Sequence, residues 1–135
     1  MTCFLLAACA STPEELVAGS KYSATANIEL NYQAVYAQLL KQGRQCYAGA
    51  VNMSVSNDVD GELFSDLKYG EMYFYQDNIQ KIYYAVVRLD AVEDGDKDAT
   101  KLTVSTGGQP EWASRKFGDA IVSWAQGNTE CIIKR

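Results

Sequence analysis

The sequence predicts an α+β fold, an antiparallel sheet of about five strands with two helices packed on one face. Two segments repeat their apolar residues with the 3.6-residue period of a helix, and the long run between them alternates with the two-residue period of strands. Each helix has a single apolar stripe, which needs a sheet face to cover. With 135 residues, 47% of them hydrophobic, the chain is long enough to bury one such core.

The N-terminal part is expected to be a tether, a strand and then a helix. Residues 10–21 form the tether, with a short helical turn that a capping box begins at Thr12 and Gly19 ends. Fully extended, these twelve residues would reach about 40 Å. A strand over 22–30 leads to a helix whose apolar residues span 32–40, with Asn31 as its N-cap and Gly43 as its end.

The remaining elements are strands followed by a second helix. The alternation predicts strands over 46–56, 63–69, 71–75, 79–92 and 101–105, the second and third being separate or one strand bent near Gly70. Polar runs predict a turn at 57–61, where Asp60-Gly61 is its sharpest element, and a loop at 93–98. The second helix opens at Pro110 and ends at Gly127. Its buried stripe is Ala113, Phe117, Ala120, Ile121 and Trp124.

Leu6-Ala7-Ala8-Cys9 has the pattern of a lipobox, in which two small residues precede a cysteine whose thiol takes a diacylglyceryl group. Cys3-Phe4-Leu5-Leu6 supplies an apolar stretch, although Met1-Thr2 lacks the usual positive charge. We therefore expect residues 1–8 to be a signal peptide whose true start lies upstream, and Cys9 to be the lipidated first residue of the mature chain. The alternative is a buried strand or helix start in a cytosolic protein.

This segment resembles the signal sequences of bacterial lipoproteins. The resemblance implies a protein of the bacterial cell envelope, in an oxidising compartment, held at the membrane by acyl chains such as palmitate. Ala10 follows the cysteine where an inner-membrane retention signal would have Asp, which favours the outer membrane, facing the periplasm. No segment approaches the roughly 18 apolar residues of a membrane-spanning helix, so the expected membrane contact is the lipid.

The two remaining cysteines, Cys46 and Cys131, most simply form one disulfide in such a compartment. Two buried free thiols are the alternative. A zinc site is not expected, because the chain has no histidine and no further cysteine nearby. The predicted bridge serves stability and carries no redox chemistry.

Composition argues against several classes of function. The net charge of −5 disfavours nucleic acid and an anionic membrane surface as partners. Without histidine, catalysis would depend on carboxylates, tyrosines or lysines, and the acidic residues gather in predicted turns, so we expect no enzyme and no catalytic residues. Ser56, Asp58 and Asp60 imitate the start of an EF-hand loop, but Leu67 stands where the bidentate Glu belongs. We expect no metal and no cofactor.

Tyrosine is the remaining anomaly, with nine residues in the chain. One face of a two-layer fold stays open, so alternate tyrosines of the strand region must point outward, and Tyr73, Tyr75 and Tyr83 are the candidate binding surface. Cross-strand aromatic packing is the alternative explanation.

The element order resembles the helix-grip arrangement of small periplasmic lipoprotein domains, such as those in the C subunit of the β-barrel assembly machinery. The expected organisation is a signal peptide over 1–8, a lipidated tether over 9–21 and one periplasmic domain over 22–135. The leading expectation is a non-catalytic binding or envelope-assembly accessory domain with a periplasmic or envelope protein as partner. The alternatives are a small-ligand carrier with a pocket between helices and sheet, and a carboxylate-based hydrolase.

Overall fold

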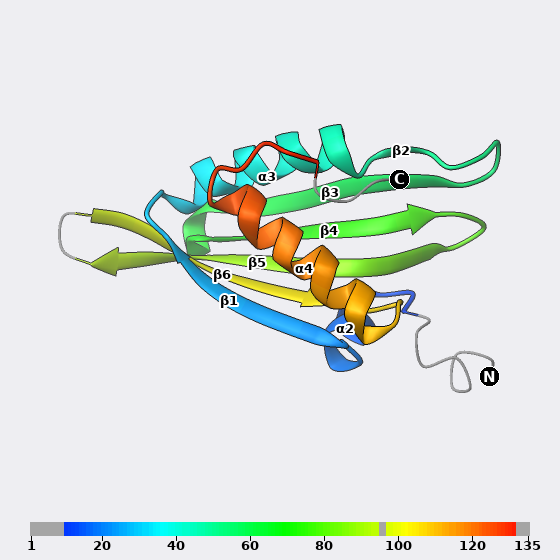
Figure 1. Cartoon of the computed structure of the whole chain (residues 1–135). Helices are drawn as coiled ribbons and strands as arrows, with labels where there is room; N and C mark the ends of the chain where they lie inside the picture. Colours follow the sequence, from blue (N-terminus) through cyan, green and yellow to red (C-terminus); the bar gives the residue numbers. More distant parts are fainter. Residues whose placement is uncertain (1–9, 95–96, 132–135) are drawn as a thin grey trace.

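The computed structural model describes residues 10–94 and 97–131. In chain order the elements are α2 (Pro13–Ala18), β1 (Tyr22–Ile28), α3 (Tyr32–Cys46), β2 (Gly49–Ala50), β3 (Ser56–Phe64), a 3-10 turn (Ser65–Leu67), β4 (Tyr69–Asp77), β5 (Lys81–Asp94), β6 (Lys97–Thr106) and α4 (Glu111–Ala125). Figure 1 shows a long twisted sheet with α3 and α4 lying across one face. None of the described helices is long and apolar enough to cross a membrane.

The six strands form one antiparallel sheet in the order β1-β6-β5-β4-β3-β2. The predicted α+β class with an antiparallel sheet under two long helices is confirmed. The sheet has one strand more than expected because β2 contributes a two-residue edge pairing. A register irregularity between Phe74 and Tyr75 shifts the pairing of β4 with β5, so that Phe74 pairs with Ala85 and Tyr75 with Tyr83.

The core lies between the sheet and the two long helices. It contains Val35 and Leu39 of α3, Ile121 and Trp124 of α4, and the inward residues of the central strands, all of them buried. At Gly43 the helix approaches β3 and β4 so closely that an added Cβ would lie 2.9 Å from a methyl of Val59. Glycine is therefore required there by packing, and the prediction that Gly43 ends the helix is wrong: α3 continues to Cys46.

Several predicted local signals are confirmed. The side chain of Asn31 accepts a hydrogen bond from the backbone N–H of Ala34 at 2.8 Å, which caps α3. The hydroxyl of Thr12 accepts one from the N–H of Glu15 at 3.1 Å, which caps α2. The second long helix runs over Glu111–Ala125, inside the predicted limits.

The prediction was wrong between residues 46 and 69. Residues 57–61, expected to turn, lie in β3, and most of the expected strand over 46–56 is a helix end and a loop. Asp58 and Asp60 point to one side of β3 while Val59 packs into the core, so the acidic pattern is that of a strand with one exposed face. The real reversal comes at residues 65–68, where Lys68 takes a left-handed conformation with φ of 56°. Likewise, strands β5 and β6 extend into the loop expected at 93–98.

Residues 10–21 pack on the domain instead of extending from it. Ala10 and Leu16 are 5% and 2% exposed and form a second apolar cluster with Val86. The carbonyl of Ala10 accepts a hydrogen bond from the N–H of Tyr83 at 2.9 Å. Val86 points away from α3 and α4, so α2 covers part of the opposite side of the sheet, which we call the far face.

The sulfur atoms of Cys46 and Cys131 lie 2.07 Å apart, with their Cα atoms separated by 5.1 Å. The two cysteines thus lie at disulfide distance, and the pairing would tie the segment after α4 to the last turn of α3. Cys9 lies outside the described residues.

Candidate functional site

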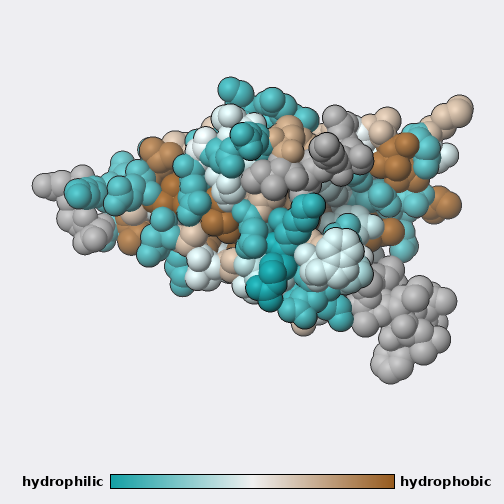
Figure 2. All heavy atoms as spheres, in the orientation of Figure 1, coloured by the Kyte–Doolittle hydropathy of each residue, from teal (hydrophilic) through white to brown (hydrophobic). Residues whose placement is uncertain are grey.

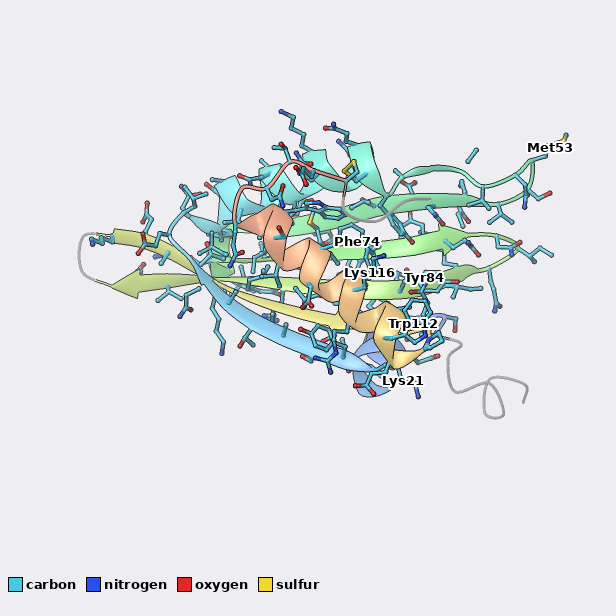
Figure 3. All side chains as sticks on the ribbon, in the orientation of Figure 1. Lys21, Met53, Phe74, Tyr84, Trp112 and Lys116 are labelled. Atoms are coloured by element: carbon cyan, nitrogen blue, oxygen red, sulfur yellow. A yellow bond between two sulfur atoms is a disulfide. The ribbon has the colours of Figure 1, made fainter. Side chains whose placement is uncertain are left out.

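A cavity of about 640 Å³ opens between the two long helices and one end of the sheet. Its walls come from the end of α3, the segment through β2, the neighbouring ends of β3, β4 and β5, and the first two turns of α4. The described lining residues are Cys46, Tyr47, Ala50, Val51, Asn57, Gln76, Tyr84, Gln109, Trp112, Ala113, Lys116 and Phe117. Figure 3 shows Tyr84, Trp112 and Lys116 gathered around the N-terminal half of α4.

Glycines before α4 shape one wall of the cavity. Gly107 donates its N–H to the carbonyl of Tyr84 at 3.0 Å, which carries the chain from the sheet toward the helix. Gly108 then adopts φ of +77°, and an added Cβ would lie 2.7 Å from the ring of Tyr84. Only glycine satisfies both demands, so Gly108 lets the loop pass tightly over Tyr84 while α4 begins beside it.

Aromatic rings form the floor of the cavity. The ring of Tyr47 stacks on Phe117, with centroids 5.4 Å apart, and meets the edge of Phe74 at 5.3 Å. Phe74 in turn meets Phe117 edge to face at 5.5 Å. These contacts hold the rings in fixed orientations, because all three residues are buried and interlocked. Of these three residues, Tyr47 and Phe117 line the cavity, and Phe74 supports them from below.

Tyr47 also brings a polar group to this floor. The residue is 8% exposed, and its buried hydroxyl has no hydrogen-bond partner among the residues that the structure describes. Burial, together with the nearby Tyr84 and Asp58, raises the pKa of this hydroxyl above its ordinary value, so it stays neutral. An unpaired buried hydroxyl costs about 1–3 kcal/mol, which makes it a feature to explain.

The charge of the lining differs from that of the protein. Lys116 is the only charged residue among the described lining residues, and no carboxylate is among them, although the chain carries a net charge of −5. Lys116 is exposed and makes no ion pair within the described part of the chain. Asn57 and Gln76, paired across β3 and β4 at 3.4 Å, are neutral. The cavity thus presents one positive charge at its rim.

The three tyrosines predicted as a binding surface lie together on the far face. Tyr83 contacts both Tyr73 and Tyr75, with ring centroids 6.1 and 5.6 Å apart. Tyr75 is only 6% exposed, and the residues of α2 pack over Tyr73 and Tyr83. The three residues form one cluster, which offers little free aromatic area.

Acidic side chains surround these tyrosines. The hydroxyl of Tyr73 donates to Glu71 at 3.0 Å, and that of Tyr75 donates to Asp58 at 3.4 Å. Burial and the negative charges of Asp58 and Asp60 raise the pKa of Tyr75 to about 12. Burial and the bond to Glu71 raise the pKa of Tyr73 as well. On the far face, then, the tyrosines act as hydrogen-bond donors to β3 and β4 carboxylates.

The two carboxylates of the EF-hand-like pattern lie along β3. Asp58 and Asp60 lie two residues apart on β3, and each accepts a hydrogen bond from the backbone N–H of the residue that follows it. Within the described residues, no group of three or more His, Cys, Asp or Glu side chains is placed to hold a metal ion.

Sequence reasoning missed the cavity residues. Tyr47, Tyr84 and Trp112 come from three distant segments, and no local pattern marks them as neighbours. The one available signal was the exposed Trp112 at the start of α4, an aromatic residue outside the apolar stripe of its helix.

Comparisons with known proteins do not assign a family. No protein-family model matches the chain. No curated protein matches it either. Among solved structures, the fold is similar to the Mll3558 protein from Rhizobium loti, with a TM-score of 0.44 and 9% sequence identity over 78% of this chain and 93% of that chain. A likeness at this level carries no argument about function, which must come from the site itself.

Proposed function

We propose that this chain is a lipid-anchored lipoprotein of the bacterial envelope whose domain binds a small ligand in the cavity without catalysis. The cavity carries the proposal: about 640 Å³ lies within the range of roughly 300–1,000 Å³ typical of small-molecule sites. The lipid anchor is supported by Leu6-Ala7-Ala8-Cys9. The helix-grip-like description is supported by the element order, with one long helix before the strands β2–β6 and one after them.

The lining indicates the chemistry of the ligand. The apolar and aromatic lining residues favour an apolar body, and Lys116, the only charged residue among the described lining residues, favours an anionic group at one end. We therefore propose an amphipathic carboxylate or similar anion of a few hundred daltons.

The far face supports the alternative, docking of an envelope protein, less well. Its tyrosines are packed against each other and α2, and Tyr75 is nearly inaccessible. A carboxylate-based hydrolase is also supported less well, because the described lining of the cavity contains no carboxylate. We therefore rank the small-ligand carrier first.

A pair of fluorescent probes tests the proposal. 1-Anilinonaphthalene-8-sulfonate has a flat apolar body and an anionic group, and N-phenyl-1-naphthylamine has the same body without the charge. We expect saturable one-to-one binding of both, tighter for the sulfonate. Lys116→Met should weaken sulfonate binding about two- to five-fold, the range of a solvent-exposed ion pair, and leave the uncharged probe unaffected. Lys101→Met, on β6 and outside the cavity, is the matched control.

A second variant separates the cavity from nonspecific binding. Ala113 lines the cavity, so Ala113→Phe should fill part of it and reduce the affinity for both probes, while circular dichroism confirms that the fold is kept. Ala37→Phe, on an exposed position of α3, should have no effect. Unsaturable binding, or equal binding by the wild type and Ala113→Phe, would show that the cavity is not a ligand site.

A further inference from the structure

Two apolar side chains protrude into solvent at one end of the sheet. Met53, in the loop between β2 and β3, and Ile79, in the turn between β4 and β5, have relative exposures of 104% and 103%. Val51 of the same loop is 53% exposed. Figure 3 shows Met53 pointing away from the body of the domain, and Figure 2 shows apolar atoms at this end of the molecule.

The sheet register puts both side chains at the same end. Ser56, which follows the β2–β3 loop, pairs with Asp77, which precedes the β4–β5 turn. We call residues 51–55 and 78–80 together the loop end. The opposite end of β3 and β4 is closed by the turn at residues 65–68, where Leu67 is 69% exposed.

The chain enters the fold at the loop end. The carbonyl of Ala10 accepts the N–H of Tyr83 at 2.9 Å, and Tyr83 comes four residues after Ile79, in the first part of β5. Ala10 is buried, so the described part of the chain is anchored at this end of the sheet. In the sequence Ala10 directly follows Cys9, the proposed site of lipidation.

The exposed apolar side chains and the entry of the chain thus lie at the same end of the sheet. We infer that the loop end lies on the surface of the bilayer that holds the Cys9 lipid, with Met53 and Ile79 inserted at the boundary between headgroups and acyl chains. The inference rests on the proposed lipid anchor. Because residues 10–21 are packed on the sheet, they leave no long spacer between lipid and domain. Burying the side chains of Met53 and Ile79 away from water lowers the free energy of the bound state. The acidic far face has no electrostatic attraction to an anionic membrane surface.

Quenching by brominated acyl chains measures this contact on the full chain in phospholipid vesicles. We would compare Met53→Trp with Leu67→Trp, each combined with Trp112→Phe, so that buried Trp124 is the only other tryptophan. We expect the Met53→Trp protein to be quenched at least twofold more strongly than the Leu67→Trp protein. The intact mass of the same samples reports whether Cys9 carries lipid.

The outcomes separate this inference from the lipid anchor. Equal quenching at positions 53 and 67 in a lipidated chain would overturn the inference and leave the anchor standing. An unlipidated mass would overturn the anchor and, because the inference rests on it, the inference as well, whatever the quenching at position 53. A blue-shifted emission at position 53 without bromolipid quenching would indicate a protein contact and overturn the inference.

Discussion

Replacing Tyr47 by Phe should stabilise the protein, which is the opposite of what removing a polar group usually does. The hydroxyl is buried and has no partner among the described residues, so its desolvation is uncompensated in the ligand-free protein. Phe keeps the ring, which stacks on Phe117 and meets the edge of Phe74. We expect a gain of about 1 kcal/mol, the lower end of the cost of an unsatisfied buried group. For a domain of this size that raises Tm by about 3–4 °C.

Differential scanning calorimetry and urea unfolding of the ligand-free protein measure this gain. Tyr22→Phe is the matched control, because it deletes the same atom where the hydroxyl donates to Asp119 at 2.6 Å, and it should lower stability by about 0.5–1 kcal/mol. If Tyr47→Phe instead destabilised the protein as much as Tyr22→Phe does, the hydroxyl would already have a hydrogen-bond partner, and the reasoning from its uncompensated burial would be refuted.

Two further predictions concern the covalent link and the tyrosines of the far face. Reduction of the Cys46–Cys131 pair should lower the free energy of unfolding by about 4.5 kcal/mol in the chain-entropy model, because the pair closes a loop with a sequence separation of 85. The double variant Cys46→Ala/Cys131→Ala should not respond to reductant, and an unchanged urea midpoint in wild type with both thiols titrated as free would contradict the estimate. Alkaline pH should also destabilise the fold, because Tyr75, with its pKa raised to about 12, stays neutral in the folded state while it ionises near pH 10 when unfolded. The stability that it contributes is complete below pH 10 and is lost as the pH rises through 12. Tyr75→Phe should therefore show a smaller loss between pH 9 and 11.5 in urea titrations, and identical losses in both proteins would exclude the effect.

Local signals in the sequence predicted the helices well because their causes are local. Asn31 caps α3 through its own neighbours, and the apolar stripe of α4 repeats at helical spacing whatever lies beneath it. The prediction of Gly43 as a helix end failed because a glycine is required there by close packing against β3 and β4, which lie beside it only in the folded chain.

The predicted strand boundaries around residues 57–61 were wrong for a related reason. Asp60-Gly61 is typical of a turn, but in β3 the glycine sits where an added Cβ would lie 2.6 Å from the carbonyl oxygen of Glu71 and 2.9 Å from the hydroxyl of Tyr36. Close packing from a strand and a helix, neither of them adjacent in sequence, decides that position. No pattern within 57–61 contains this information.

In the candidate site, too, features with local causes could be predicted and features that depend on distant segments could not. Alternation along β5 would put Tyr83 on the core side with Ala85 and Val87. The register irregularity between Phe74 and Tyr75 brings Tyr83 instead to the far face, and no local pattern reveals this shift or the packing of α2 over that face. The cavity is more remote still from the sequence, because its walls need the end of α3, the strand ends and the start of α4 at once. Its most informative property, a single cation among the described lining residues of an acidic protein, emerges only from that assembly.

The most direct test of the central claim is to compare native and denaturing intact masses of the chain purified from its own cells. If the cavity binds a small amphipathic anion, the native mass of the wild type should exceed the denatured mass by one molecule of a few hundred daltons. The Ala113→Phe protein, with its cavity partly filled, should lack that increment. Equal native and denatured masses in the wild type, or the same increment in both proteins, would contradict the assignment of the cavity as the ligand site.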